Sequence, residues 1–249
     1  MLAVIDKGVA NKVQINKLKH KATDSKIELL GNNNSVYVES NCEFKNLRIV
    51  IKGDNSHFTI KRGCRFWGGS ISISDQTELY IGERTNIGLR CEFILESANV
   101  RIGNDCMSAA GLTIRTSDTH GVYDLDSGLL VNQPQDIVVG DYVWFGKDVT
   151  IMKGSEVGSC CVIALGAIVT KKTGDFELWG GIPASKLKDN IIWSKSARLK
   201  SVEDDKYASL YISKYKNADG ALSNDGTKKP GRGTKTTATK KKSENDASV

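Results

Sequence analysis

Bulky apolar residues recur at every sixth position between residues 139 and 169, and the residue four places after each is small or β-branched. This spacing fits neither an α-helix nor a simple strand, but it fits a chain that turns a corner every six residues. Three such sides form one coil, and stacked coils form a parallel β-solenoid. The large apolar positions are Val139, Phe145, Ile151, Val157, Ile163 and Val169.

The pattern extends upstream in a looser form. An apolar residue followed by glycine recurs at 81–82, 87–88 and 102–103, and earlier starts lie at Val38 and Ile60. Successive starts are 21 or 22 residues apart, so we expect bulges or longer corners in these coils. The sequence thus predicts the following segments: a lead-in or cap over 1–35, a solenoid over 36–194, a C-terminal segment with a short helix over 195–218, and a tail over 219–249.

The smaller positions of each hexad carry two further expectations. Glycine often directly follows the large apolar residue, as at Gly140 and Gly146, and we expect corners there whose backbone angles suit glycine. Five of the six cysteines lie four places after an apolar start, so we expect buried thiols that act as small hydrophobes. These five are Cys42, Cys64, Cys91, Cys106 and Cys161.

The hexads stop between Ile114 and Val139, where about twenty polar residues leave the pattern over 115–137. Solenoids tolerate insertions at their corners, and long insertions are often functional. His120 lies near the start of this excursion, beside Asp118 and Thr119, where no apolar pattern requires it. The excursion is therefore predicted to be a functional loop with His120 as its candidate chemical group.

Charge and composition limit the function classes. The net charge is +6, and residues 222–249 hold seven basic against three acidic residues with few apolar ones. This tail is predicted to be disordered, and it is either simply solvated or attracts a polyanion or an anionic membrane face. No apolar run is long enough to cross a membrane. The N-terminus lacks a cleavage signal, so the chain is predicted to be cytoplasmic.

Three stretches of sequence resemble the hexapeptide-repeat acyltransferases, specifically their sugar O-acetyltransferase branch. They are "IRTSDTHGVYD" in the excursion, "VGDYVWFG" over 139–146 and "GIPA" over 181–184. Together with "IIWSKSARLKSVEDDK" after the repeats, they are most similar to bacterial capsule O-acetyltransferases that act on polysialic acid. The resemblance implies a left-handed parallel β-helix, acetyl-CoA as acetyl donor, and an anionic capsular polysaccharide as acceptor.

Histidine suits the role of base for a sugar hydroxyl, because its pKa lies near neutral pH. We therefore expect His120 to take the hydroxyl proton, with a backbone carbonyl or Asp118 holding its second ring nitrogen. Trp144 is the candidate oxyanion donor, because its indole nitrogen can only donate. Alternatively Trp144 packs against a neighbouring subunit or forms a wall of the CoA channel. With the cysteines pointing inward, we expect direct transfer without an acyl-enzyme.

The resemblance further implies a homotrimer with active sites between subunits and acetyl-CoA along the prism. Outward aromatic residues at Tyr142, Trp144 and Trp179 would favour such an assembly. No metal site is expected, because the cysteines match no zinc spacing. The positions that match the family's CoA contacts are Lys147, Leu165, Thr170, Lys171 and Lys188, with Lys186 as a substitute for an arginine often found where Ser185 stands.

Two other functions are compatible with a hexapeptide solenoid. A purely structural scaffold would have uninterrupted coils, whereas this chain carries the loop histidine and the Trp144 segment. An N-acetyltransferase acting on an amino sugar nucleotide would usually carry a separate N-terminal domain, whereas weak repeats begin here by about Val38. Nucleic-acid binding through the tail lacks any accompanying motif, so no nucleic-acid partner is expected.

Overall fold

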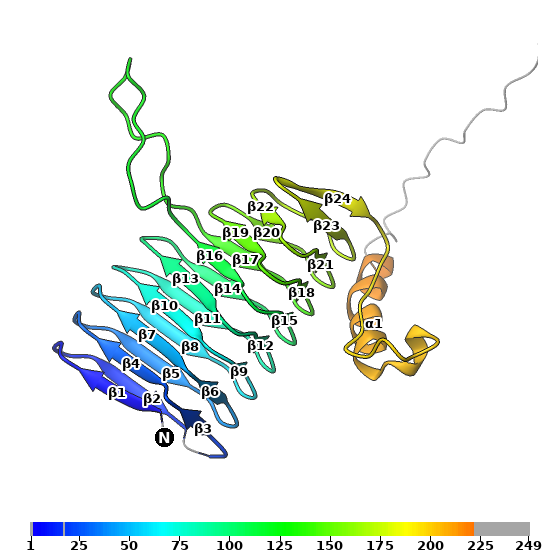
Figure 1. Cartoon of the computed structure of the whole chain (residues 1–249), viewed down its shortest axis with the longest axis horizontal. Coiled ribbons are helices and arrows are strands. Elements are labelled where there is room, and N and C mark those ends of the chain that lie inside the picture. Colours follow the sequence, from blue (N-terminus) through cyan, green and yellow to red (C-terminus); the bar gives the residue numbers. More distant parts are fainter. Residues whose placement is uncertain (1, 17, 222–249) are drawn as a thin grey trace, which may run out of the picture.

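The computed structural model describes residues 2–16 and 18–221, which form a stack of parallel β-coils followed by one helix (Figure 1). The first sheet contains β1 (Ala3–Asp6), β4 (Lys26–Leu29), β7 (Leu47–Ile51), β10 (Gly69–Ile73), β13 (Cys91–Leu95), β16 (Thr113–Arg115), β19 (Thr150–Met152) and β22 (Ile168–Val169). The second sheet contains β2 (Lys12–Ile15), β5 (Ser35–Val38), β8 (His57–Ile60), β11 (Glu78–Ile81), β14 (Val100–Ile102), β17 (Ile137–Val139) and β20 (Glu156–Val157).

The third sheet closes the prism and ends in an antiparallel hairpin. It contains β3 (Lys21–Thr23), β6 (Glu43–Lys45), β9 (Arg65–Phe66), β12 (Asn86–Ile87), β15 (Met107–Ser108), β18 (Trp144–Phe145), β21 (Val162–Ile163), β23 (Leu178–Gly181) and β24 (Ala184–Lys188). The described chain ends with a short 3-10 helix η1 (Val202–Asp204) and the helix α1 (Lys206–Ala221). No helix among the described residues is long and apolar enough to span a bilayer. The tail over 222–249 lies outside these residues.

The expected three-sided β-solenoid is confirmed, and its core follows the hexads. All six large apolar positions are buried, and adjacent coils align them, as in the register of Phe145 with Ile163. The upstream coils are longer because their strands have up to five residues, as in β7 and β10. The coils begin at Ala3, so the solenoid starts well before the boundary expected at residue 36.

Glycine directly after the large apolar residue is required by close approach of the backbone rather than by unusual backbone angles. A Cβ on Gly103 would lie 2.4 Å from the carbonyl oxygen of Gly140 in the next coil. The corner positions with positive φ are filled largely by polar residues instead, including Asp105 and Asp148. The expectation about corner angles is therefore corrected: the coils stack too tightly there for any side chain.

The helix α1 packs along one side of the solenoid. Tyr142 is buried between Trp193 and Tyr211, with ring centroids 4.5 and 4.6 Å away. The carboxylate of Asp141 accepts hydrogen bonds from Lys214 at 2.6 Å and from Tyr215 at 2.7 Å. The C-terminal segment therefore covers the corner between the second and third sheets and leaves the end of the stack to the β23–β24 hairpin.

We expect Asp141→Ala to destabilise the docking of α1 by about 1–3 kcal/mol, because it leaves partly buried donors without their acceptor. Those donors include the backbone amide of Asn104, which lies 2.8 Å from the Asp141 carboxylate. Urea unfolding followed by tryptophan fluorescence measures the loss. Asp189→Ala is the matched control, since the Asp189 side chain is 68% exposed.

The same contact predicts a dependence on pH. Burial raises the pKa of Asp141, but hydrogen bonds from Lys214, the Asn104 amide and Tyr215 outweigh it and hold the pKa below its ordinary value. A carboxyl whose pKa is lowered by folding contributes stability above its unfolded pKa of about 3.9, and that stability is lost as the pH falls. An Asp141→Ala protein that loses the same stability on acidification as the wild type would contradict this assignment.

Candidate active site

The excursion loop leaves the solenoid between β16 and β17, at the corner between the first and second sheets (Figure 1). Its first residues, Thr116 and Ser117, are buried in the stack. The Ser117 hydroxyl donates to Glu96 and accepts the amide of Thr119 at 2.7 Å. The loop therefore leaves the scaffold from a fixed point, and His120 follows directly.

Three polar residues tie the two ends of the loop together beneath His120. Lys153, which follows β19, donates to Asp118 at 2.6 Å and to the carbonyl of Asn132 at 2.9 Å. Asn132 in turn donates to Asp118 at 2.9 Å and to the carbonyl of His120 at 2.8 Å. Hydrogen bonds from Lys153 and Asn132 lower the pKa of Asp118, which keeps it ionised at neutral pH. The chain turns directly after Lys153, and Gly154 permits this turn because its φ is +74°. A Cβ at Gly154 would also lie 2.1 Å from the side-chain oxygen of Gln135.

His120 is exposed at the edge of a cavity of about 370 Å³ that is also lined by Ser74, Glu96, Asp118 and Asn132. Within the described residues, Asp118 pairs with Lys153 and Asn132, and no hydrogen bond joins it to the imidazole of His120. The network therefore positions the backbone that carries His120 and leaves both ring nitrogens open to ligands.

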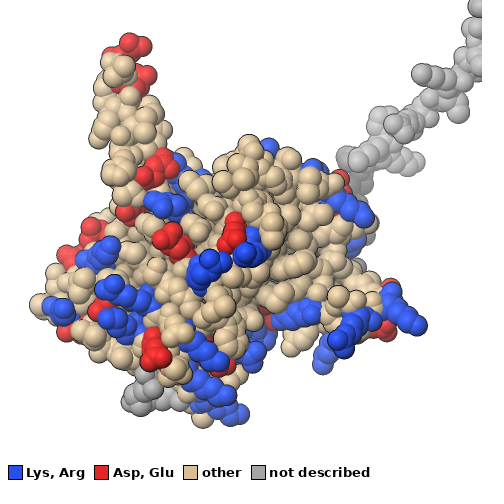
Figure 2. Space-filling model, viewed as in Figure 1, with Lys and Arg blue, Asp and Glu red and all other residues tan. Residues whose placement is uncertain are grey.

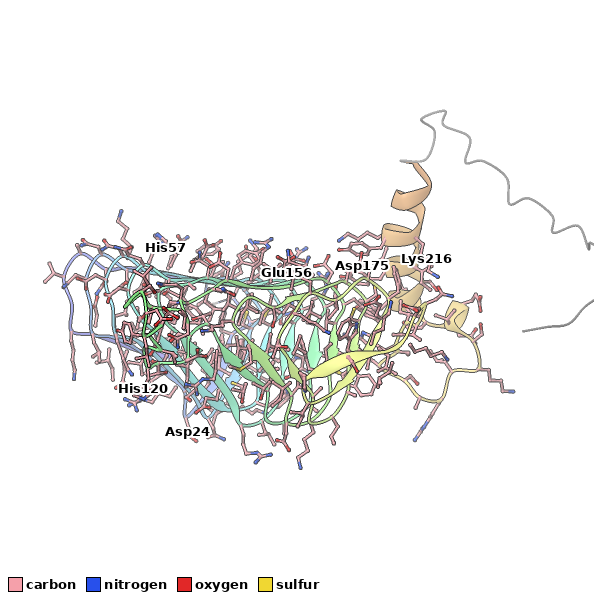
Figure 3. All side chains as sticks on the ribbon, turned by 90° about the horizontal axis from the view of Figure 1, so that it is seen from above. Asp24, His57, His120, Glu156, Asp175 and Lys216 are labelled. Atoms are coloured by element: carbon pink, nitrogen blue, oxygen red, sulfur yellow. The ribbon has the colours of Figure 1, made fainter. Side chains whose placement is uncertain are left out.

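Trp144 does not share this cavity. It projects from β18 on the third sheet, 37% exposed, with its ring centroid 6.1 Å from that of Trp193. His120 lies in the loop at the corner between the first and second sheets, which is opposite the third sheet, and Figure 3 shows it well separated along the stack from the helix that carries Lys216. A single chain thus does not bring the two predicted catalytic side chains together.

The predicted CoA contacts fall into three groups toward the C-terminal end. Lys147 and Leu165 occupy the same corner in adjacent coils, where the Gly166 amide donates to the Lys147 carbonyl, and Leu165 is 72% exposed. Thr170 and Lys171 follow β22, and the Lys171 ammonium lies 5.5 Å from the ring of Trp179. The remaining lysines, Lys186 and Lys188, lie on β24.

One expectation about these regions is corrected. Lys186, still a candidate CoA contact, pairs with Glu177 at 3.1 Å and with Asp189 at 2.7 Å. Tyr142 and Trp179 were expected to face outward but are buried, Tyr142 beneath the C-terminal segment and Trp179 at the last coil. They therefore provide no surface for an assembly, and Trp144 alone of the three is partly exposed.

All six cysteines are buried and free. The five on the inward track lie in the solenoid core as expected, whereas Cys160 packs in the cluster around Tyr142. Burial raises the pKa of Cys91 and Cys106 to about 12, so neither supplies a thiolate at neutral pH. Among the described residues no group of three or more His, Cys, Asp or Glu side chains could hold a metal ion.

We expect Lys153→Met to lower kcat about tenfold to a hundredfold, because small displacements of a catalytic group have effects of that size. Hydrogen exchange of the loop amides should rise, and Lys153→Arg should restore part of the activity. Lys172→Met is the matched control, since Lys172 is 71% exposed and its ion-pair partner among the described residues is the exposed Glu156. Equal loss of activity in both variants would contradict a positioning role for Lys153.

A three-sided parallel solenoid interrupted by a histidine-bearing corner loop defines a hexapeptide-repeat acyltransferase. No family model matches the chain. The chain is 30% identical over 201 residues to a polysialic acid O-acetyltransferase of Neisseria meningitidis, covering 80% of this chain and 93% of the relative. It is 36% identical over 146 residues to one of Escherichia coli, and this match spans 59% of the chain but only 48% of that relative.

Two solved structures superpose over most of this chain. The polySia-specific acetyltransferase NeuO superposes with a TM-score of 0.83 at 36% identity, covering 86% of this chain and 91% of that one. The polysialic acid O-acetyltransferase OatWY superposes with a TM-score of 0.77 at 28% identity, covering 84% and 99%. The chain belongs to the family of these O-acetyltransferases and is an acyltransferase.

Proposed function

We propose that this protein transfers an acetyl group from acetyl-CoA to a hydroxyl of a capsular polysialic acid. The observation that carries the proposal is the placement of His120 at an open cavity, in a fold shared with enzymes that bear that activity in their names. The net charge of +6 suits a polyanionic acceptor. Use of acetyl-CoA would place the reaction in the cytoplasm.

In this mechanism the imidazole of His120 accepts the proton of the sugar hydroxyl as its oxygen attacks the thioester carbonyl. The C–S bond then breaks, and His120 returns the proton to the departing thiolate, so an acetyl ester and free CoA leave. The tetrahedral oxyanion requires a donor in place beforehand, and the indole N–H of Trp144 is the candidate. Because all six thiols are buried in the solenoid, none is placed to attack a thioester, and transfer proceeds directly in a ternary complex.

The described residues fit an acetyl-CoA site toward the later coils. Leu165 offers an exposed apolar side chain to the pantetheine arm, and Lys147 lies one coil away at the same corner. Lys171 and Lys188 supply charge for the phosphates. Lys186, with two carboxylate partners, is the weakest of these candidates.

A homotrimer would bring His120 of one chain to Trp144 of its neighbour. The loop supports this arrangement, because its apolar side chains have no cover within one chain, and Leu125 is 98% exposed. The exposed apolar residues of the loop are Val122, Tyr123, Leu125, Leu129 and Val131. Their burial against neighbours would contribute about 25 cal/mol for each Å² of apolar surface.

The test is release of CoA thiol from acetyl-CoA with purified polysialic acid, compared with a neutral capsular polymer and an amino sugar nucleotide. Thiol release with polysialic acid, together with a new ester on the polymer, is the expected result. Turnover with only the neutral polymer would agree with the proposed transfer mechanism but would contradict polysialic acid as the acceptor. Turnover with only the amino sugar nucleotide would favour N-acetylation instead.

A further inference from the structure

A second cavity, of about 340 Å³, lies between the third sheet and the C-terminal segment. In Figure 1 this is the edge where β9, β12 and β15 face the chain before α1, and in Figure 2 positively charged side chains gather along that edge. Side chains from both parts of the molecule line the cavity, notably Arg65, Asn86, Met107, Lys195 and Tyr207.

The cavity carries unpaired positive charge. Arg84, at its inner wall, is held by Asp105 through two hydrogen bonds of 2.8 and 2.7 Å, and Asp105 is buried. In contrast, neither Arg65 nor Lys195 forms an ion pair with any described residue. Burial raises the pKa of Asp205, but the hydrogen bond from Ser194 and those from the amides of Ala208 and Tyr207 outweigh it, and the charge of Lys195 lowers the pKa further. Two cations are therefore available to a carboxylate in this cavity.

Neutral groups complete the site. The indole of Trp67 donates to Oδ1 of Asn86 at 2.7 Å, which leaves the Asn86 amide hydrogens without an acceptor among the described residues. Tyr207 is 43% exposed and presents its ring beside the Lys195 ammonium, 5.1 Å away. Cations, an amide donor and an aromatic face together suit a sugar that carries a carboxylate.

The cavity is connected to Trp144 along the outer surface of the third sheet. Arg65, Asn86, Met107 and Trp144 are register partners on successive coils, so their side chains form one straight row. With about 4.8 Å between strands, Met107 lies one step and Arg65 three steps, about 14 Å, from Trp144. The predicted CoA contacts Lys147 and Leu165 lie at this coil and beyond it, away from the cavity.

We propose that this cavity is an acceptor subsite that binds the carboxylate of a sugar residue adjacent to the one being acetylated. Arg65 and Lys195 bind the carboxylate, the Asn86 amide donates to the sugar, and the Tyr207 ring contacts its face. The inference rests on the proposed function, because it takes Trp144 as the reaction centre. It also explains why a C-terminal segment is held against this corner by α1.

The test compares Arg65→Gln, Lys195→Gln and the double variant with wild type, using long polysialic acid and a sialic acid dimer as acceptors. The double variant should raise KM for the polymer about tenfold, the factor that 1.4 kcal/mol of lost binding free energy represents. The values of kcat and of KM for acetyl-CoA should stay within about twofold, because no reacting group changes. The matched controls are Arg48→Gln and Lys52→Gln, exposed basic residues elsewhere on the solenoid.

Binding is also measured without turnover, by titrating the protein with unacetylated polysialic acid at low and high salt. The wild-type affinity should fall more steeply with salt than that of the double variant, since two charges are removed. An unchanged KM for the polymer would overturn the subsite while leaving the proposed function intact. So would a rise in the KM for acetyl-CoA alone, because it would mean that the two cations bind the phosphates of CoA. Failure of the wild type to bind or acetylate polysialic acid would overturn both.

Discussion

Replacing His120 by alanine is expected to lower kcat about 10²- to 10⁴-fold, the usual contribution of a positioned general base. The fold should be unaffected, because the side chain is exposed and no hydrogen bond joins its ring to a described residue. Steady-state thiol release with polysialic acid measures the loss. Added imidazole should restore part of the activity, which a purely structural role would not allow.

His57→Ala is the matched control for this experiment. His57 is exposed on β8, with Nδ1 2.6 Å from the Ser35 hydroxyl, and in the view of Figure 3 it lies across the width of the solenoid from His120. Its replacement should leave kcat within about twofold. A His120→Ala protein with near-normal kcat would show that another group takes the hydroxyl proton.

Trp144→Phe is expected to lower kcat about 10²- to 10³-fold, as removal of an oxyanion donor does elsewhere. Phenylalanine keeps an aromatic ring beside Trp193 but removes the indole N–H, so the variant separates donation from packing. If Trp144 instead packs against a neighbouring subunit or forms a wall of the CoA channel, Trp144→Phe should remain active while Trp144→Ala loses activity. Single-turnover kinetics at saturating acetyl-CoA measure the chemical step.

Mixing the two inactive proteins tests whether the site is shared between subunits. After unfolding and refolding together, His120→Ala and Trp144→Ala chains should form mixed trimers in which some interfaces carry both native residues. Partial recovery of thiol release is the expected result, with each variant refolded alone as the control. If trimers form and mix but activity stays absent, His120 and Trp144 do not act at one interface.

The core of this protein could be predicted from its sequence because each hexad repeats one local geometry. An inward side chain every sixth residue requires only that the chain keep turning, so Phe145 and Ile163 could be assigned to the core without knowing any partner. The buried cysteines follow from the same repeat. The loop could be located because the repeat stops at Ile114. Its composition, however, does not indicate which residues its side chains contact.

The first coils were harder to assign. Their inward residues, such as Val13 at the open end of the stack, are partly exposed, and the hexad is diluted by longer strands. The repeat is first recognisable in the sequence at Val38, whereas the register already pairs Val13 with Val36. The hexad pattern is clear only in coils that have a neighbouring coil on both sides, because only there are the inward side chains fully buried.

What the sequence alone determined is the solenoid, its inward residues and the presence of a histidine in a corner insertion. The tertiary structure decided the contacts that act on these elements: Lys153 meets Asp118 across 35 positions, and Tyr211 meets Asp105 across 106. Such polar contacts leave no periodicity, because a single long-range hydrogen bond constrains two residues and nothing between them. The cavity of Arg65 and Lys195 arises for the same reason, where the C-terminal segment folds back against coils formed by residues far earlier in the chain.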